Sequence, residues 1–216
     1  MSWIQQLQTV NWHQGLSVSL GAYLLGCFTV GYYLVRWRTG EDIREIGSGS
    51  VGAKNVGRYF GKSGFILTAL GDIGKGALAV WVTRHFTPDQ KLPALAALAM
   101  LAVTAGHIWP VQLWFRGGKG IATLLGALLV YDYHQALIFV VVFLCAFVIF
   151  RKTVLPGLFG VACLPLADIY FERDPACAVI VSISAALVLF MHRKNIVEEC
   201  VHLAMRRHFH THSDQS

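Results

Sequence analysis

The chain has 216 residues, of which 55% are hydrophobic and only 14% are charged, and its mean hydropathy is +0.54. Soluble domains carry roughly 25% charged residues, so the composition excludes an ordinary soluble domain and favours a single membrane-embedded domain over residues 1–216. The net charge of +6 would suit a nucleic-acid partner only if membrane orientation did not explain the basic residues.

Apolar runs of membrane-spanning length recur along the chain. A bilayer core needs about 20 apolar residues in a helix. The clearest runs are 15–35, 64–84, 92–114, 135–150, 154–171 and 176–191. The run 120–131 is shorter, which predicts a half-helix extended by its flanks or a re-entrant segment. Counting it, the pattern predicts an all-α, polytopic membrane helix bundle of about seven transmembrane segments.

The basic residues predict how this bundle is oriented. Fourteen of the eighteen Lys and Arg residues fall on one side of the predicted membrane, in the connection 36–62, around 116–119 and 151–152, and after residue 192. By the positive-inside rule this side is cytoplasmic, with the N-terminus outside and a short cytoplasmic tail, 197–216. Topology therefore explains the positive charge, and no nucleic-acid partner is expected. The alternating histidines of the tail, at 208, 210 and 212, are expected to be solvated, and no metal site is predicted.

The first candidate site is the glycine-rich stretch GSGSVGAKNVGR, residues 47–58. Glycines allow close backbone approach, and successive N–H groups can form an anion-binding nest. The candidate donors in it are Ser48, Gly49, Gly52, Lys54, Asn55 and Arg58. The stretch thus predicts a phosphate site, although a flexible basic loop at the membrane surface would have a similar composition.

The second candidate site is RGGKG, residues 116–120, which leads directly into an apolar helical run. Free N–H groups at a helix N-terminus, the helix dipole and the charge of Lys119 all favour an anion, with Gly117, Gly118 and Gly120 allowing close approach. No GxxxxGK[ST] spacing occurs, so P-loop ATP hydrolysis is not predicted. The alternative is a positively charged turn whose glycines cap a helix.

Polar residues also lie inside or at the ends of predicted spans. Asp72 and Lys75 sit mid-span with i, i+3 spacing, so they should face the protein interior and pair. For Asp72 and Lys75 we favour a structural ion pair over a role in lining a polar pocket. His107, at the end of the next span, is placed in the same group of structural or pocket-lining residues. His192 and Asn195 follow the last span.

Taken in order, these motifs resemble the bacterial acyl-phosphate-dependent glycerol-3-phosphate acyltransferases, the PlsY family. GSGSVGAKNVGRYFGK and LGDIGKGALAV resemble the family's first conserved block and the following helix. GHIWPVQLWFRGGKGIAT resembles the second block, and HRKNI the start of the third. The resemblance covers most of the chain.

The resemblance implies an inner-membrane enzyme, of EC class 2.3.1, with its active site facing the cytoplasm. Such an enzyme transfers a fatty acyl group from acyl phosphate to the sn-1 hydroxyl of glycerol 3-phosphate, giving lysophosphatidate for phospholipid biosynthesis. No cofactor, metal or obligate protein partner is implied beyond these substrates and membrane lipids. The family's active-site positions correspond here to Ser48, Arg58, Lys119, His192 and Asn195.

This chain departs from the family pattern at several positions. Ser50, Val51 and Lys54 replace the usual Asn, Pro and Thr, and Val154 and Gly157 stand where serines are usual. Two alternatives therefore stay open beside the family reaction. One is an acyltransferase of the same fold with a changed acceptor or donor, and the other is a non-enzymatic membrane protein that binds anions or lipids.

Overall fold

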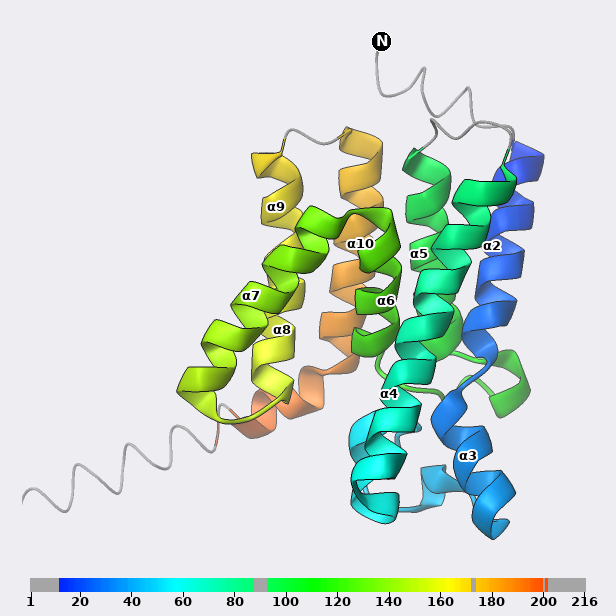
Figure 1. Cartoon of the computed structure of the whole chain (residues 1–216), viewed down its shortest axis with the longest axis vertical. Coiled ribbons are helices and arrows are strands. Elements are labelled where there is room, and N and C mark those ends of the chain that lie inside the picture. Colours follow the sequence, from blue (N-terminus) through cyan, green and yellow to red (C-terminus); the bar gives the residue numbers. More distant parts are fainter. Residues whose placement is uncertain (1–11, 88–92, 172–173, 200, 202–216) are drawn as a thin grey trace, which may run out of the picture.

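The computed structural model describes residues 12–87, 93–171, 174–199 and 201, and their regular elements are all helices (Figure 1). The all-α prediction is thereby confirmed, while the histidines predicted to be solvated in the tail lie outside the described residues. The α-helices are α2 (Trp12–Cys27), α3 (Val30–Thr39), α4 (Ala53–Phe86), α5 (Pro93–Ile108), α6 (Ile121–Tyr131), α7 (Tyr133–Phe150), α8 (Val154–Ala162), α9 (Leu164–Tyr170) and α10 (Pro175–Met191). Two 3-10 turns, η1 (Ile43–Glu45) and η2 (Val111–Leu113), lie in the connections.

Four helical segments among the described residues are long and apolar enough to cross a membrane, and a bent pair makes a fifth. The four are Trp12–Thr39, Ala53–Phe86, Pro93–Leu113 and Tyr133–Phe150. The bent pair is Pro175–Met191 with Arg193–Glu199, which turn by 58°. The shorter apolar elements are α6 and the segment Val154–Tyr170. The expected total of seven depends on those shorter elements, so this number and the orientation stay predictions.

Several of the predicted elements are interrupted or extended for identifiable reasons. The run 154–171 forms two helices, α8 and α9, because Pro165 has no N–H to donate to the preceding turn. The glycine-rich stretch 47–58, expected to be a loop, becomes helical at Ala53. Inside α4, Gly61 has φ 69° and ψ −159°, so residues 53–60 form a separate short helix joined to the long span.

Glycines allow α4 and α6 to pack backbone against backbone. A Cβ on Gly76 would lie 2.1 Å from the carbonyl oxygen of Thr123, and one on Gly126 would lie 1.9 Å from that of Ile73. Such contacts are the usual way in which membrane helices associate closely. They place the first turn of α6, which follows the predicted phosphate loop, against the middle of α4.

Candidate active site

One cavity of about 240 Å³ brings together the residues that the sequence separated into distant motifs. Its lining comes from the connection before α4, from α4 itself, and from the segments around 119–122, 153–154 and 192–195. All five predicted catalytic residues line it: Ser48, Arg58, Lys119, His192 and Asn195. Of the predicted phosphate-binding residues, the cavity is lined by Gly52, Lys54, Asn55 and Gly120.

Asn55 organises the first loop from inside. Its side-chain oxygen accepts a hydrogen bond from the Ser48 N–H (3.0 Å), and its side-chain nitrogen donates to the carbonyl oxygens of Ile43, Ile46 and Ser50. The residue is only 3% exposed. Since these contacts occupy its amide, Asn55 shapes the loop that carries Ser48, and phosphate binding by Asn55 stays a prediction.

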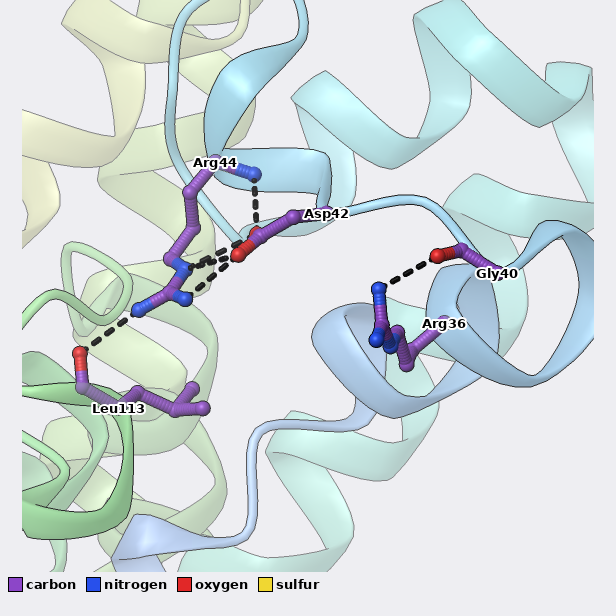
Figure 2. A network of polar contacts seen from close by, with 5 residues as sticks. All are labelled: Arg36, Gly40, Asp42, Arg44 and Leu113. Carbon is purple, nitrogen blue, oxygen red and sulfur yellow. Dashed lines mark hydrogen bonds and ion pairs between the residues drawn. The ribbon is translucent and has the colours of Figure 1, made fainter.

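A hydrogen-bond network centred on Arg44 connects the segment before this loop to the segment before α6 (Figure 2). The Arg44 side chain donates to the Asp42 carboxylate through Nε (2.9 and 3.0 Å) and Nη2 (2.5 Å), and its Nη1 donates to the carbonyl oxygen of Leu113 (2.7 Å). The hydrogen bond from Arg44 keeps the pKa of the Asp42 carboxyl below its usual value. Nearby, Arg36 donates to the carbonyl oxygen of Gly40, which ends α3. The 3-10 turns that precede the two candidate phosphate loops, η1 and η2, are therefore directly linked.

Three of the predicted phosphate-binding glycines use their N–H groups within the protein. Gly117 donates to the carbonyl oxygen of Ile108 (3.1 Å), Gly118 to that of His107 (3.0 Å) and Gly49 to that of Ile46 (3.1 Å). A Cβ on Gly118 would also lie 2.0 Å from Nε2 of His107. Contrary to the expectation from sequence, these N–H groups are not free for phosphate, and the glycines of RGGKG allow the loop to pack on the end of α5.

The N-terminus of α6 provides the free N–H groups in their place. Gly120, which precedes the helix with φ 92°, lines the cavity together with Ile121 and Ala122. The first N–H to bond within the helix is that of Leu124, to the carbonyl oxygen of Gly120. The N–H groups before it have no partner within the helix, so they and the helix dipole favour an anion at this end of the cavity.

Lys119 and Asn195 meet across the cavity. The Lys119 ammonium donates a hydrogen bond to the side-chain oxygen of Asn195. Burial lowers the pKa of Lys119; the Glu198 carboxylate opposes this shift, and the cations Lys54, Arg58 and Lys194 add to it. This crowding of positive charge in a partly dehydrated cavity is what a doubly charged phosphate would relieve.

His192 is buried at the end of α10, with 5% of its surface exposed. Its Nδ1 lies 2.8 Å from the carbonyl oxygen of Val188, so Nδ1 carries the hydrogen and Nε2 is the free acceptor in the neutral ring. Burial lowers the pKa of His192, against the Val188 hydrogen bond, and the nearby charge of Lys119 lowers it further. The residue therefore offers the cavity a neutral hydrogen-bond acceptor at physiological pH.

Asp72, Lys75 and His107 form a buried polar cluster below the cavity. Lys75 Nζ lies 3.0 Å from Oδ1 of Asp72 and 2.8 Å from Nδ1 of His107. It also donates to the carbonyl oxygens of Gly26 (3.0 Å) and Phe28 (2.9 Å), at the break between α2 and α3. The cluster thus connects α2, α4 and α5 with the break between α2 and α3, while Asp72 and His107 also line the cavity.

The cavity wall also contains residues that were not predicted from the sequence motifs. Thr153 and Phe65 line it, and Lys152 beside Thr153 forms an ion pair with Glu199 of the segment Arg193–Glu199. Among the departures from the family pattern, Ser50, Lys54 and Val154 line the cavity. Val51 instead packs in a small core with Val35, Ile43 and Val56. Thr153 and Phe65 have no unusual chemistry or spacing that could have identified them.

Comparisons with known proteins identify a family that the chain matches. Residues 16–200 match the family model described as glycerol-3-phosphate acyltransferase. The chain is 44% identical over 193 residues to glycerol-3-phosphate acyltransferase 1 of Desulfitobacterium hafniense, covering 89% of this chain and 94% of that protein. It is 38% identical over 175 residues to glycerol-3-phosphate acyltransferase 1 of a Bacillus cereus strain, covering 81% and 92%.

A solved structure resembles the chain over a similar extent. It is the glycerol 3-phosphate form of PlsY (YgiH), an integral membrane glycerol 3-phosphate acyltransferase. The two share a TM-score of 0.78 and 29% sequence identity over 87% of this chain and 92% of that one. The lysophosphatidic acid form of the same protein gives a TM-score of 0.76.

Proposed function

The chain belongs to the PlsY family of glycerol-3-phosphate acyltransferases, and on this basis we propose that it transfers a fatty acyl group from acyl phosphate to the sn-1 hydroxyl of glycerol 3-phosphate. One observation carries the proposal. A single cavity gathers Ser48, Arg58, Lys119, His192 and Asn195 from separate segments of the chain. The proposed products are lysophosphatidate and inorganic phosphate.

The charges of the cavity suit two phosphate-bearing substrates. Lys54, Arg58 and Lys119 line it together with the N-terminus of α6. The one carboxylate among its described lining residues is Asp72, which is paired with Lys75. Holding two anions side by side with a preorganised set of cations lowers the entropic and electrostatic barriers to their reaction.

The chemistry then requires little more than orientation. In the proposed step the hydroxyl oxygen forms a bond to the acyl carbonyl carbon, and the bond from that carbon to the phosphate oxygen breaks, with its electron pair leaving on phosphate. Neutral His192 accepts the hydrogen bond of the attacking hydroxyl through Nε2 and so aligns it. The departing phosphate takes the proton of the hydroxyl and leaves as hydrogen phosphate. Lys119 and the α6 N–H groups stabilise the negative charge that develops.

We also propose the placement that the positive-inside pattern predicts. The cavity opens among the segments 36–62, 116–119, 151–152 and 192–199, which carry most of the basic residues. An active site at the cytoplasmic face of a bacterial inner membrane would follow. It would give glycerol 3-phosphate direct access from the cytoplasm, without an obligate protein partner.

A changed acceptor or donor is the second candidate, and one observation favours it. Three of the departures from the family pattern, Ser50, Lys54 and Val154, line the reaction cavity. Lys54 adds a cation where the family usually has a neutral threonine. An acceptor or donor with more negative charge would use that cation.

An acyl-transfer assay on the purified full chain in lipid tests both candidates. Acyl phosphate and glycerol 3-phosphate are supplied, and lysophosphatidate and free phosphate are followed. We expect product from the wild type and from Arg38→Ala, an exposed cation outside the cavity. Lys119→Ala should lose about 100-fold or more in rate, the scale of one lost oxyanion donor. Lys119→Arg should keep part of the charge but misplace it.

The possible results separate the candidates. Phosphate release without lysophosphatidate would point to a different acceptor. Neither product from folded protein, with full activity in a known relative run in parallel, would overturn the proposal. Equal activity of Lys119→Ala and wild type would remove the cavity from the mechanism.

A further inference from the structure

His107 lies between the buried polar cluster and the loop that leads into α6. It is near the end of α5 and only 3% exposed, yet it lines the reaction cavity. Its carbonyl oxygen accepts the N–H of Gly118 (3.0 Å), and a Cβ on Gly118 would lie 2.0 Å from Nε2 of the His107 ring. The ring therefore lies directly against the residue that precedes Lys119.

The other ring nitrogen, Nδ1, accepts a hydrogen bond from Lys75. The Lys75 ammonium has three N–H groups and no lone pair. Its three hydrogen bonds run to the carbonyl oxygens of Gly26 (3.0 Å) and Phe28 (2.9 Å) and to Nδ1 of His107 (2.8 Å). Oδ1 of Asp72 lies 3.0 Å away as an ion pair, but it receives no hydrogen bond from the described residues. Since an ammonium can only donate, Nδ1 presents its lone pair to Lys75.

This contact fixes where the ring of His107 carries its hydrogen. In a neutral imidazole one nitrogen donates and the other accepts, so an accepting Nδ1 puts the hydrogen on Nε2. A second hydrogen, on Nδ1, would face the Lys75 ammonium at 2.8 Å, so the ring stays neutral. His107 thus donates through Nε2, whereas His192, whose Nδ1 lies on the carbonyl oxygen of Val188, accepts through Nε2.

Nε2 of His107 is open to a partner in the cavity. Within the described part of the chain, the polar contacts of the ring involve Nδ1. Nε2 has no partner there, and yet it is not one of the buried polar atoms that lack a partner, so it is accessible from the cavity that His107 lines. Lys119 and Gly120, at the start of α6, line the same cavity. The Nε2–H, the Lys119 ammonium and the free N–H groups of α6 are all hydrogen-bond donors.

Such a set of donors matches phosphate, whose oxygens are strong acceptors. A substrate hydroxyl that donates its hydrogen needs an acceptor instead, and His192 provides one. The charge of the donor also matters, because Lys54 and Arg58 already act against the positive charge of Lys119. A neutral N–H donor adds a hydrogen bond to phosphate without adding to this repulsion between cations.

We propose that the Nε2–H of His107 donates a hydrogen bond to a phosphate oxygen of a substrate bound at the N-terminus of α6, and that Lys75 holds His107 in this donating form. The inference rests on the proposed function, to which it adds His107 as a binding residue and Lys75 as a positioning residue. The phosphate belongs either to glycerol 3-phosphate or to the acyl donor. Kinetics with each substrate varied in turn distinguish the two.

Two substitutions separate the roles of the two ring nitrogens. His107→Asn keeps a side-chain oxygen near the position of Nδ1 for Lys75 but has no donor at Nε2, whereas His107→Gln can place its amide N–H near Nε2. We expect His107→Asn to raise the KM for one of the two phosphate substrates about tenfold, the scale of a hydrogen bond to a charged group, and to change kcat less than about twofold. His107→Gln should recover most of the loss.

Thr104→Val is the matched control for these variants. Thr104 lies one turn earlier in α5, and its buried hydroxyl has no hydrogen-bond partner among the described residues. The substitution changes the polarity of the same helix without removing a donor from the cavity, and the KM for both substrates should stay at the wild-type value.

Measurements of the tautomer and of binding need no acyl transfer. The full chain with 15N-labelled histidine is measured in lipid by NMR, and the signal of His107, one of nine histidines, is identified by its absence from His107→Asn. We expect the ring hydrogen on Nε2, and we expect inorganic phosphate to shift the Nε2 signal. Calorimetric titration with inorganic phosphate should show about tenfold weaker binding by His107→Asn than by wild type or Thr104→Val.

The results separate this inference from the proposed function. Weaker phosphate binding by His107→Asn in protein that shows no acyl transfer would keep the role of His107 and refute the reaction. A ring hydrogen on Nδ1, or equal phosphate affinity of His107→Asn and wild type, would overturn the inference even in an active enzyme. A fall in kcat with both KM values unchanged would also overturn it. So would an equal effect of Thr104→Val, because the change would then be general to the polar interior of the bundle.

Discussion

The side-chain ammonium of Lys119 donates a hydrogen bond to the side-chain oxygen of Asn195, which lies 76 positions further along the chain. Lys119 belongs to the loop that enters α6, and Asn195 to the segment Arg193–Glu199 that turns away from α10. The contact therefore joins the second and third motifs across the cavity. It aims the lysine charge without neutralising it, because the amide oxygen of Asn195 is uncharged.

Replacing Asn195 should separate the effect of the orientation of Lys119 from the effect of its charge. Asn195→Ala leaves the Lys119 ammonium without its partner, and we expect kcat to fall about tenfold or more through misplacement. Asn195→Asp supplies a carboxylate that pairs with Lys119 and competes with phosphate, so its KM for a phosphate substrate should rise above that of Asn195→Ala. Steady-state kinetics of both variants check this. Equal KM values for the two would contradict it.

The low pKa of His192 predicts an acid limit to activity. Burial places this pKa below the ordinary value of 6.5, so Nε2 is a free acceptor at neutral pH. As pH falls through the lowered pKa, protonation removes the acceptor and kcat/KM should drop. The substrates titrate in the same pH region, so the pH profile is compared with that of His192→Gln. This variant should lack the part of the acid-side fall in kcat/KM that His192 causes. Identical profile shapes would exclude this role.

The lowered pKa of His192 also predicts how the stability of the fold depends on pH. Between the lowered pKa and about 6.5 the unfolded chain binds a proton at His192 that the folded chain does not. Stability should therefore fall as pH decreases below about 6.5, and the fall should be smaller in His192→Gln.

Much of the architecture could be predicted because a bilayer restricts the choices. Long apolar runs identify α4, α5 and α7, and charge within a span identifies Asp72 and Lys75 as an interior pair. The motif residues Lys119, His192 and Asn195 could also be assigned to one site, because a family pattern already encodes their proximity. The sequence of the chain alone shows only that they are polar residues close to span ends.

What could not be predicted depends on partners far away in the chain. The N–H groups of Gly117 and Gly118 are taken by carbonyl oxygens of α5, a pairing that no local pattern reveals. The break within α4 requires the unusual φ of Gly61, whereas the surrounding sequence suits a continuous helix equally well. Phe65 and Thr153 have ordinary side chains, and only the three-dimensional arrangement places them at the cavity.

Breaking the buried pair should cost stability before it alters chemistry. Asp72→Asn leaves Lys75 buried without its carboxylate, and removing one partner of a buried pair typically costs about 3–5 kcal/mol. We expect a lowered unfolding temperature in detergent, with partial recovery in the double variant Asp72→Asn, Lys75→Met. Asp72→Asn that unfolds like wild type, with activity lost, would instead assign Asp72 a direct role at the cavity.

We expect the exposed carboxylate of Glu198 to oppose phosphate binding by electrostatic repulsion. It acts on Lys119 against the effects of burial and of the neighbouring cations. Glu198→Gln should therefore lower the KM for glycerol 3-phosphate about twofold, the modest size expected of an exposed charge, and the gain should shrink in high salt. Glu45→Gln makes the same charge change at an exposed position outside the cavity and serves as the control. A twofold gain in both variants would attribute the effect to net charge alone.

Two glycines of α4 offer a matched test of helix packing behind the site. A Cβ on Gly76 would lie 2.1 Å from the carbonyl oxygen of Thr123, whereas one on Gly74 would meet nothing within 4 Å. Gly76→Ala must push α6 away from α4, which should cost about 1–3 kcal/mol of stability and displace the first turn of α6 that lines the cavity. Gly74→Ala should be neutral or slightly stabilising, since alanine favours helix. Thermal unfolding and the KM for glycerol 3-phosphate, measured on both, check this, and equal behaviour of the two variants would show that the close approach of α4 and α6 does not position the site.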